Sequence, residues 1–192
     1  MHDQSKPARV LLFWFGGPGE HGKRHKRWFE KNPDFDREIR ERFLSLYEEA
    51  AVGQLSYLKE SAASCLALIV VLDQFPRNMF RGTRRAFAAD TLALDAARHA
   101  LAQGYDRTML PVERLFTYLP FEHSETLADQ LTACELCSSL QAFEETADVH
   151  RFAVVHRDIV ARFGRFPHRN AILGRASTPE EIEFLKQPGS GF

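Results

Sequence analysis

Two segments of the sequence carry a similar polar motif directly after an expected helix. Residues 75–78 read Phe-Pro-Arg-Asn and precede Arg81, while residues 166–170 read Phe-Pro-His-Arg-Asn and precede Arg175. Arginine presents a planar fork of donors that matches a carboxylate or a phosphate, so two such groups that meet could bind an anion. We therefore predict ligand-binding residues in and near these segments: Arg77, Asn78, Arg81, His123, Arg165, His168, Arg169 and Asn170.

The same arginines also have a purely structural interpretation. Positions 113 to 148 carry eight acids and the single base Arg114, so the arginines on either side could simply pair with those acids. Ion-pair networks often imitate binding sites. The two interpretations differ on mutation, because replacing a structural Asn78 or Arg169 by Ala should lower thermal stability, whereas replacing a binding residue should leave it nearly unchanged.

Histidines beside carboxylates indicate an alternative, enzymatic function. His123 with Glu122 or Glu125, and His156 with Asp158, could form an acid/base pair near the arginines of a hydrolase or transferase acting on a small phosphorylated or carboxylated metabolite. No nucleophile motif or phosphate-binding loop accompanies them in the sequence. We therefore assign no catalytic residue and favour a non-enzymatic binding protein for a peptide or a small anionic ligand.

Motifs for metals and cofactors are incomplete. Cys134-x-x-Cys137 after His123 is similar to part of a zinc-deaminase signature, but the proline before the first cysteine is missing. Gly17-x-Gly19-x-x-Gly22 matches a dinucleotide fingerprint only in letters, since the rest of the chain predicts helices and no parallel sheet. We predict no metal and no cofactor.

The charge and the cysteines exclude further partners. The chain has 192 residues with 25 Lys and Arg against 26 Asp and Glu, a net charge of −1. This balance gives no general attraction to nucleic acid or to an acidic membrane, and we predict neither partner. Three cysteines form an odd and sparse set that suits a reducing compartment, so we expect a cytoplasmic protein.

Helical periodicity recurs along the chain, whereas alternation with a period of two is almost absent. The expected helices cover about 34–50, 56–74, 90–104, 111–118, 124–143, 148–163 and 179–185. Pro76 should end the second helix, Pro120 should break the fourth and Ser124 should cap the fifth. We expect Leu68, Leu72 and Phe75 in the core. The fifth helix should bury one apolar side, formed by Leu127, Leu131, Cys134, Leu140 and Phe143, and the sixth should point Phe152, Val155, Ile159 and Phe163 inward.

No polar linker separates these helices, so one domain is predicted over residues 1–192. Within it we expect an N-terminal arm and loop over 1–33 and a frayed tail over 187–192. If the helices stack antiparallel, both arginine motifs could emerge at the same end of the stack. Arg77 and Arg169 should then lie within about 15 Å of each other, the span of one small-molecule pocket.

Longer stretches of the sequence carry a family resemblance. The stretches concerned are Leu72 to Asn78, Leu119 to Glu125, His156 to Asn170, Phe13 to Gly16 and Ser177 to Glu181. Together they resemble domain-of-unknown-function family 924. The resemblance implies an all-α, tetratricopeptide-like stack of antiparallel helix pairs, and it brings no activity or catalytic residue. Because no 34-residue period is visible, we expect an irregular stack of about seven helices in one compact domain.

Overall fold

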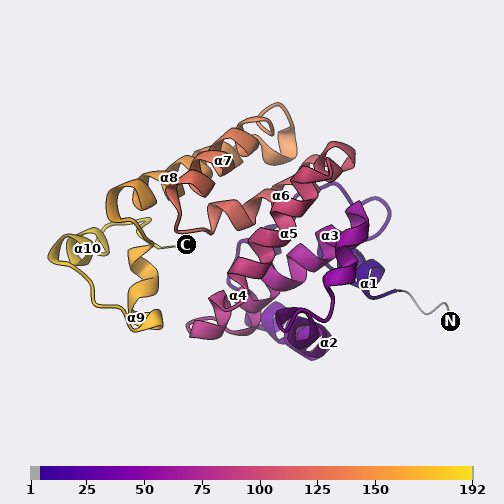
Figure 1. Ribbon diagram of the computed structural model, residues 1–192, viewed down its shortest axis with the longest axis horizontal. Helices are drawn as coiled ribbons and strands as arrows, with labels where there is room; N and C mark the ends of the chain where they lie inside the picture. The colour runs from indigo at the N-terminus through magenta and orange to yellow at the C-terminus, as the bar shows by residue number, and fades with distance from the viewer. Residues whose placement is uncertain (1–4, 192) are drawn as a thin grey trace.

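The fold is all-α across residues 5–191, the part of the chain that the computed structural model describes. These residues contain no β-strand, and α-helices alternate with short 3-10 turns (Figure 1). The α-helices are α1 (Lys6–Phe15), α2 (Pro33–Ala51), α3 (Ala62–Ile69), α4 (Phe75–Met79), α5 (Asp90–Ala102), α6 (Pro111–Glu122), α7 (Leu127–Ser138), α8 (Val149–Phe163), α9 (Asn170–Leu173) and α10 (Pro179–Phe184).

The centre of the core is one continuous helical stretch, residues 62–79. It consists of α3, a π-helical turn (Val70–Gln74) and α4. Helix α3 packs against α1, α5 and α6, and α4 packs against α2. The predicted core residues Leu68, Leu72 and Phe75 are confirmed, since each is at most 3% exposed.

The prediction that two prolines end helices is wrong for both. Pro76 lies in the first turn of α4, where a missing N–H costs little, and the wider π-helical turn before it gives the ring room. Pro120 lies inside α6, which continues to Glu122. It sits in the last turn between the buried Leu119 and Phe121, whose packing holds the backbone helical.

The expectation of an N-terminal arm over residues 1–33 is also wrong in part. Residues 6–15 form α1, and its Trp14 and Phe15 are completely buried. The indole of Trp28 donates to the carbonyl oxygen of Trp14 at 3.0 Å, which ties the following loop to the helix. This apolar segment therefore belongs to the core.

Five side chains expected to face inward are exposed instead: Leu127, Leu131, Phe143, Phe152 and Val155. The predicted helix over 124–143 is shorter, because α7 covers only Leu127–Ser138. Ser124 does not cap it, since its hydroxyl donates to the side chain of Asp129. Helix α7 buries the side of Ala133 and Cys137 against its neighbours, which leaves Leu127 and Leu131 outside.

Side chains cap the N-termini of two other helices. Asn32 accepts hydrogen bonds from the backbone N–H groups of Asp34 and Phe35 at the start of α2. Thr178 and Glu181 form the capping box of α10. Within residues 5–191, no helix is both long and apolar enough to cross a membrane.

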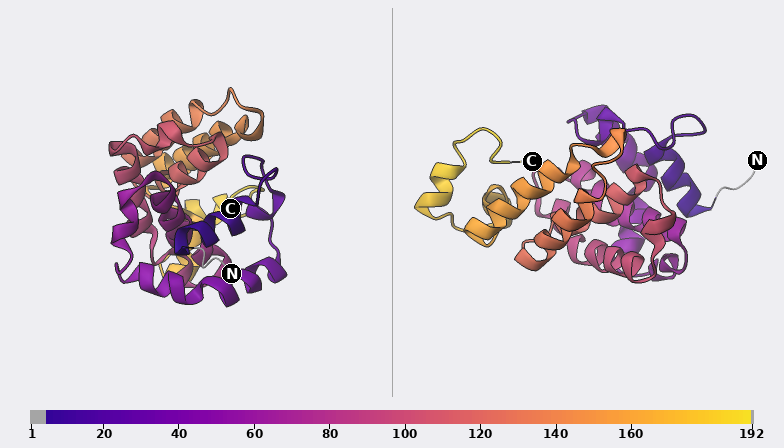
Figure 2. Two further views of the ribbon diagram at one scale, coloured as in Figure 1. Left: turned by 90° about the vertical axis from the view of Figure 1, so that its right-hand side faces the viewer. Right: turned by 90° about the horizontal axis from the view of Figure 1, so that it is seen from above.

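The C-terminal segment, residues 164–191, lies at the end of the molecule away from α1 (Figures 1 and 2). Its apolar contacts form a small cluster of their own, in which Phe166 and Phe184 pack with residues of α8. Polar contacts join this segment to the helices of the main core. They determine the geometry of the candidate site.

Candidate anion-binding site

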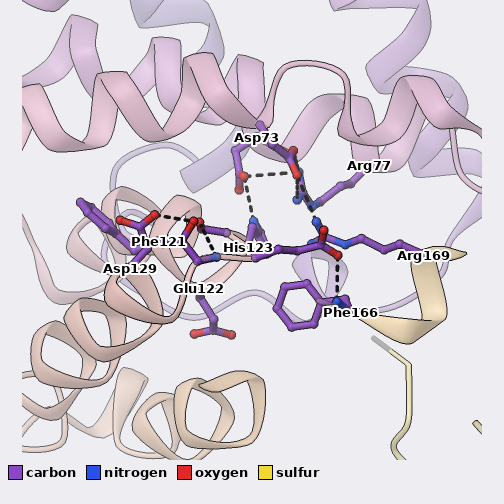
Figure 3. Close-up of polar contacts among 12 residues, drawn as sticks. Asp73, Arg77, Phe121, Glu122, His123, Asp129, Phe166 and Arg169 are labelled. Atoms are coloured by element: carbon purple, nitrogen blue, oxygen red, sulfur yellow. Dashed lines mark hydrogen bonds and ion pairs between the residues drawn. The ribbon is translucent and has the colours of Figure 1, made fainter. Parts of the chain in front are cut away.

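Five polar residues meet where the central helix, α5, α6 and the C-terminal segment come together (Figure 3). We call Asp73, Arg77, Asp90, His123 and Arg169 the arginine cluster. Asp73 comes from the π-helical turn, Arg77 from α4 and Asp90 from the first turn of α5. His123 follows the last residue of α6, and Arg169 ends a 3-10 turn of the C-terminal segment.

Arg77 is fully engaged within the cluster. Its Nη1 and Nη2 donate to the two carboxylate oxygens of Asp90 at 2.8 and 3.0 Å. Nη1 also donates to the backbone carbonyl oxygen of Asp73 at 2.8 Å and lies 3.3 Å from its Oδ1. Burial opposes the positive charge, yet Asp73 and Asp90 raise the pKa of Arg77 above its ordinary value. This arginine orders the cluster and has little capacity left for a ligand.

Asp73 orients His123. The carboxylate of Asp73 is completely buried, its Oδ1 lies 2.7 Å from Nδ1 of His123, and its Oδ2 accepts from Gln74 at 2.6 Å. Burial alone would raise the pKa of Asp73, but His123 and Arg77 lower it to about 2, so the group is ionised. Burial and then Arg77 lower the pKa of His123, against an opposing effect of Asp73.

Arg169 is under-paired. It is 6% exposed, yet the one hydrogen bond of its side chain to the rest of residues 5–191 runs from Nη1 to Asp90 at 3.5 Å, longer than an ordinary N–H···O bond. Its Nε is buried and has no hydrogen-bond partner among these residues. The guanidinium lies over the rings of Phe87 and Phe166, at 4.7 and 4.6 Å from their centroids. Burial and the neighbouring Arg77 lower the pKa of Arg169 to about 10.

Glu125 fastens the C-terminal segment beside the cluster. Its carboxylate accepts from the backbone N–H of Phe166 at 2.8 Å and from both terminal nitrogens of Arg175 at 2.6 and 2.9 Å. Arg175 also donates to the carbonyl oxygen of Phe166 at 3.1 Å. These contacts hold Phe166, and with it the aromatic surface under Arg169, against the end of α6.

Glu122 and His156 form a second, more deeply buried pair. Nδ1 of His156 lies 3.2 Å from Oε1 of Glu122 and 2.9 Å from the carbonyl oxygen of Phe152. Burial, with a smaller effect of Asp73, raises the pKa of Glu122 to about 8, and burial lowers the pKa of His156 to about 3. Both groups are therefore neutral near pH 7. Glu122 points away from His123 (Figure 3).

The structure brings some of the predicted site residues together and separates others. Arg77, Arg169 and His123 meet, and both arginines contact the carboxylate of Asp90, which confirms the expected proximity of the two motifs. Asn78 and Arg81 instead bind Asp36 of α2. The remaining residues of the second motif lie within the C-terminal segment, where Arg165 and Asn170 bind Glu181 and His168 packs beside Phe166.

The predicted pair of His156 and Asp158 is not formed. Asp158 is exposed and pairs with its neighbour Arg157, whereas His156 is 6% exposed and faces Glu122. One turn of helix α8 would have to unwind to bring them together. Of the alternative acid/base residues, His123 alone belongs to the arginine cluster.

Sequence reasoning missed the two carboxylates that organise the cluster. The sequence pattern of Asp90 is typical of a helix cap, but Ala89 occupies the cap position and the Asp90 side chain binds the arginines. Asp73 follows an apolar run expected to be buried on all sides. A carboxylate in such a run needs a cation or a hydrogen-bond donor beside it to offset the cost of its desolvation. The position of Asp73 in the sequence could therefore have indicated a buried polar contact.

The fold places the chain in a class of all-helical proteins. The family model described as a bacterial protein of unknown function, DUF924, matches residues 10–189, so the chain belongs to that family. The chain is also similar to a solved structure, the protein of unknown function ATU0120 from Agrobacterium tumefaciens. The two share 42% sequence identity with a TM-score of 0.83, over 94% of this chain and 96% of the other. No curated protein shows significant similarity to the chain.

Proposed function

We propose that this protein binds a small anionic ligand at the arginine cluster, through the guanidinium of Arg169. The observation that carries the proposal is the under-paired state of Arg169, whose buried Nε has no partner among residues 5–191 and whose one bond to Asp90 is long. A buried charge without good partners is costly, and a carboxylate or phosphate oxygen would offset that cost.

The site favours a small anion over a peptide. The side chains of Arg77, His123 and Asp90 are 18, 15 and 22% exposed, so the cluster touches solvent over a small area. Such an opening suits a group of a few atoms better than an extended backbone. The exposed hollows beside the start of α2 and between α8 and α10 contain no residue of the cluster.

The binding experiment compares two arginines. Isothermal titration with acetate and with inorganic phosphate should detect binding to the native protein that Arg169→Met abolishes. Arg81→Met is the matched control, because Arg81 makes a two-pronged ion pair with Asp36 outside the cluster. Equal affinities of the native protein and Arg169→Met for both anions would refute the proposal.

A second candidate function is a hydrolase or transferase that uses His123 as a general base. The specific observation is the Asp73–His123 hydrogen bond, since a carboxylate that holds one ring nitrogen directs the other toward a substrate. Hydrolysis of a carboxylate or phosphate ester that is lost in His123→Asn and kept in Arg81→Met would favour this candidate. Failure of His123→Asn to change any turnover would exclude it.

The arrangement of the helix pairs and the cellular location of the protein are also proposed. We propose that the helix pairs form a tetratricopeptide-like stack, supported by the packing of α6 on α7 and of α7 on α8. We also propose a cytoplasmic location, supported by three buried cysteines that are not joined as disulfides. Detection of the tagged protein in the cytoplasmic fraction of its host would test the location.

A further inference from the structure

We propose that the ligand of the arginine cluster carries a hydroxyl group that donates to Nε2 of His123, so that the natural ligand class is a small hydroxy monocarboxylate. The inference rests on the proposed function, because it assigns the ligand of the same site. Its basis is the hydrogen-bonding state of His123 together with the charges around Arg169.

The tautomer of His123 follows from its contact with Asp73. The ionised carboxylate can only accept, so the hydrogen on the short 2.7 Å contact belongs to Nδ1 of the ring. In a neutral imidazole Nε2 is then a hydrogen-bond acceptor. The buried surroundings and the nearby Arg77 favour the neutral form. His123 thus presents an acceptor at the edge of an anion site.

That acceptor has no partner among residues 5–191. No group there donates a hydrogen bond to Nε2, and the side chain is 15% exposed, so water reaches the ring. A ligand that covered the ring without supplying a donor would leave Nε2 unsatisfied. A site with an exposed acceptor of this kind discriminates against ligands that lack the matching hydroxyl.

The surrounding charges favour a single negative charge on the ligand. Asp73, Asp90 and Glu125 face the three guanidinium groups of Arg77, Arg169 and Arg175, so cations and anions already balance in number. Among these arginines, Arg169 is the one whose guanidinium still has a buried N–H donor without a good acceptor among residues 5–191. A dianionic phosphate would bring two negative charges among three carboxylates, whereas a carboxylate brings one.

Arg169 and His123 belong to one network of ion pairs. Asp73 contacts both His123 and Arg77, and Asp90 contacts both Arg77 and Arg169, so two shared carboxylates connect them. Figure 3 shows the Arg169 side chain extending from the C-terminal segment toward His123. In a ligand bound between them, the carboxylate would face Arg169 and a hydroxyl on the neighbouring carbon would face His123.

The test compares lactate, propionate and inorganic phosphate by isothermal titration at pH 8, where phosphate is mainly dianionic. Propionate matches lactate apart from the hydroxyl. Lactate should bind about tenfold more tightly than propionate, the gain expected for one good hydrogen bond. Phosphate should bind more weakly than lactate, and Arg169→Met should abolish binding of all three.

Asp73→Asn tests the role of the tautomer. Because Gln74 donates to Oδ2 of Asp73, the asparagine oxygen should take that position and its amide should face Nδ1 of His123. The ring proton then moves to Nε2, and the preference for lactate over propionate should disappear. The histidine ¹⁵N spectrum of the native protein supplies a measurement independent of any variant, in which Nε2 of His123 should be unprotonated at pH 7.

Each outcome separates the inference from the proposed function. Equal affinities for lactate and propionate, or a protonated Nε2 in the native protein, would overturn the inference and leave anion binding by Arg169 intact. Tighter binding of phosphate than of lactate would overturn the monocarboxylate class. Binding that Arg169→Met does not change would overturn the proposed function itself.

Discussion

Replacing Arg169 by methionine should stabilise the ligand-free protein while it destroys the anion site. Methionine reaches about as far as Nε of arginine and carries no charge, so the change removes a buried guanidinium and keeps the apolar stem of the side chain. Exchanges of buried charges for apolar side chains are often neutral or stabilising. A residue that binds a ligand but destabilises the ligand-free fold should show both effects when it is replaced: a more stable protein and a loss of anion binding.

The size of the effect follows from the surroundings of Arg169. The fall of its pKa from 12.5 to about 10 corresponds to a penalty of roughly 3 kcal/mol on the charged form. The cation–π contacts with the rings of Phe87 and Phe166 offset about 1 to 2 kcal/mol of this penalty, and the 3.5 Å hydrogen bond to Asp90 offsets little of it. The net gain in the free energy of unfolding is about 1 to 2 kcal/mol.

Chemical denaturation in a buffer of low anion content measures this gain, and a thermal melt should rise by about 2 to 8 °C. The matched control is Arg175→Met, which removes a guanidinium that donates two hydrogen bonds to Glu125 and leaves that carboxylate without a positively charged partner. The control should lose about 2 to 4 kcal/mol. If Arg169→Met were as destabilising as Arg175→Met, Arg169 would be a structural residue and the reasoning would be refuted.

Three further predictions concern the core, the thiols and the buried acid. Leu72→Ala should lower the free energy of unfolding by about 2 to 5 kcal/mol in chemical denaturation, because Leu72 is 2% exposed in the central helix. A loss well below about 1 kcal/mol would contradict its central position. Cys134 and Cys137 are buried thiols, so elemental analysis of protein purified without chelator should find no stoichiometric zinc; zinc that is lost on Cys137→Ser would show a metal site. The pKa of Glu122 is raised from an ordinary 4.5 to about 8 in the folded protein, so between these pH values the folded protein binds one more proton than the unfolded chain. The free energy of unfolding should therefore fall as the pH rises from about 5 to 8, by at most roughly 5 kcal/mol. Glu122→Gln should flatten that fall, and an unchanged slope between native protein and variant would show that Glu122 is not its source.

The helices could be predicted where local signals and tertiary packing agree. The caps at Asn32 and Thr178 belong to this kind of signal, because a cap depends on the few residues beside it. Helix breaking by Pro76 and Pro120 failed, since tertiary packing and a π-helical turn override the local preference of proline. The packing that keeps a helix intact at a proline depends on residues distant in sequence, which helical periodicity does not reveal.

The candidate site could be predicted in part for a similar reason. The repeated motif located Arg77 and Arg169, and both reach Asp90 because helix ends meet at one place in the fold. The pairing of Asp73 with His123 spans 50 positions and has no pattern in the sequence. Asn78 shares the motif with Arg77 but faces α2, because neighbouring helix residues point in different directions.

The arginine Nε–H NMR spectrum of the native protein during a titration with acetate tests the central claim most directly. The Nε–H signal of Arg169, identified by its loss in Arg169→Met, should shift to saturation, because a carboxylate binds beside the buried Nε, which has no hydrogen-bond partner among residues 5–191. The signals of Arg165 and Arg81, whose Nε groups already donate to Glu181 and Asp36, should stay in place. An Arg169 signal that does not move, while acetate binding is detected elsewhere, would contradict the account.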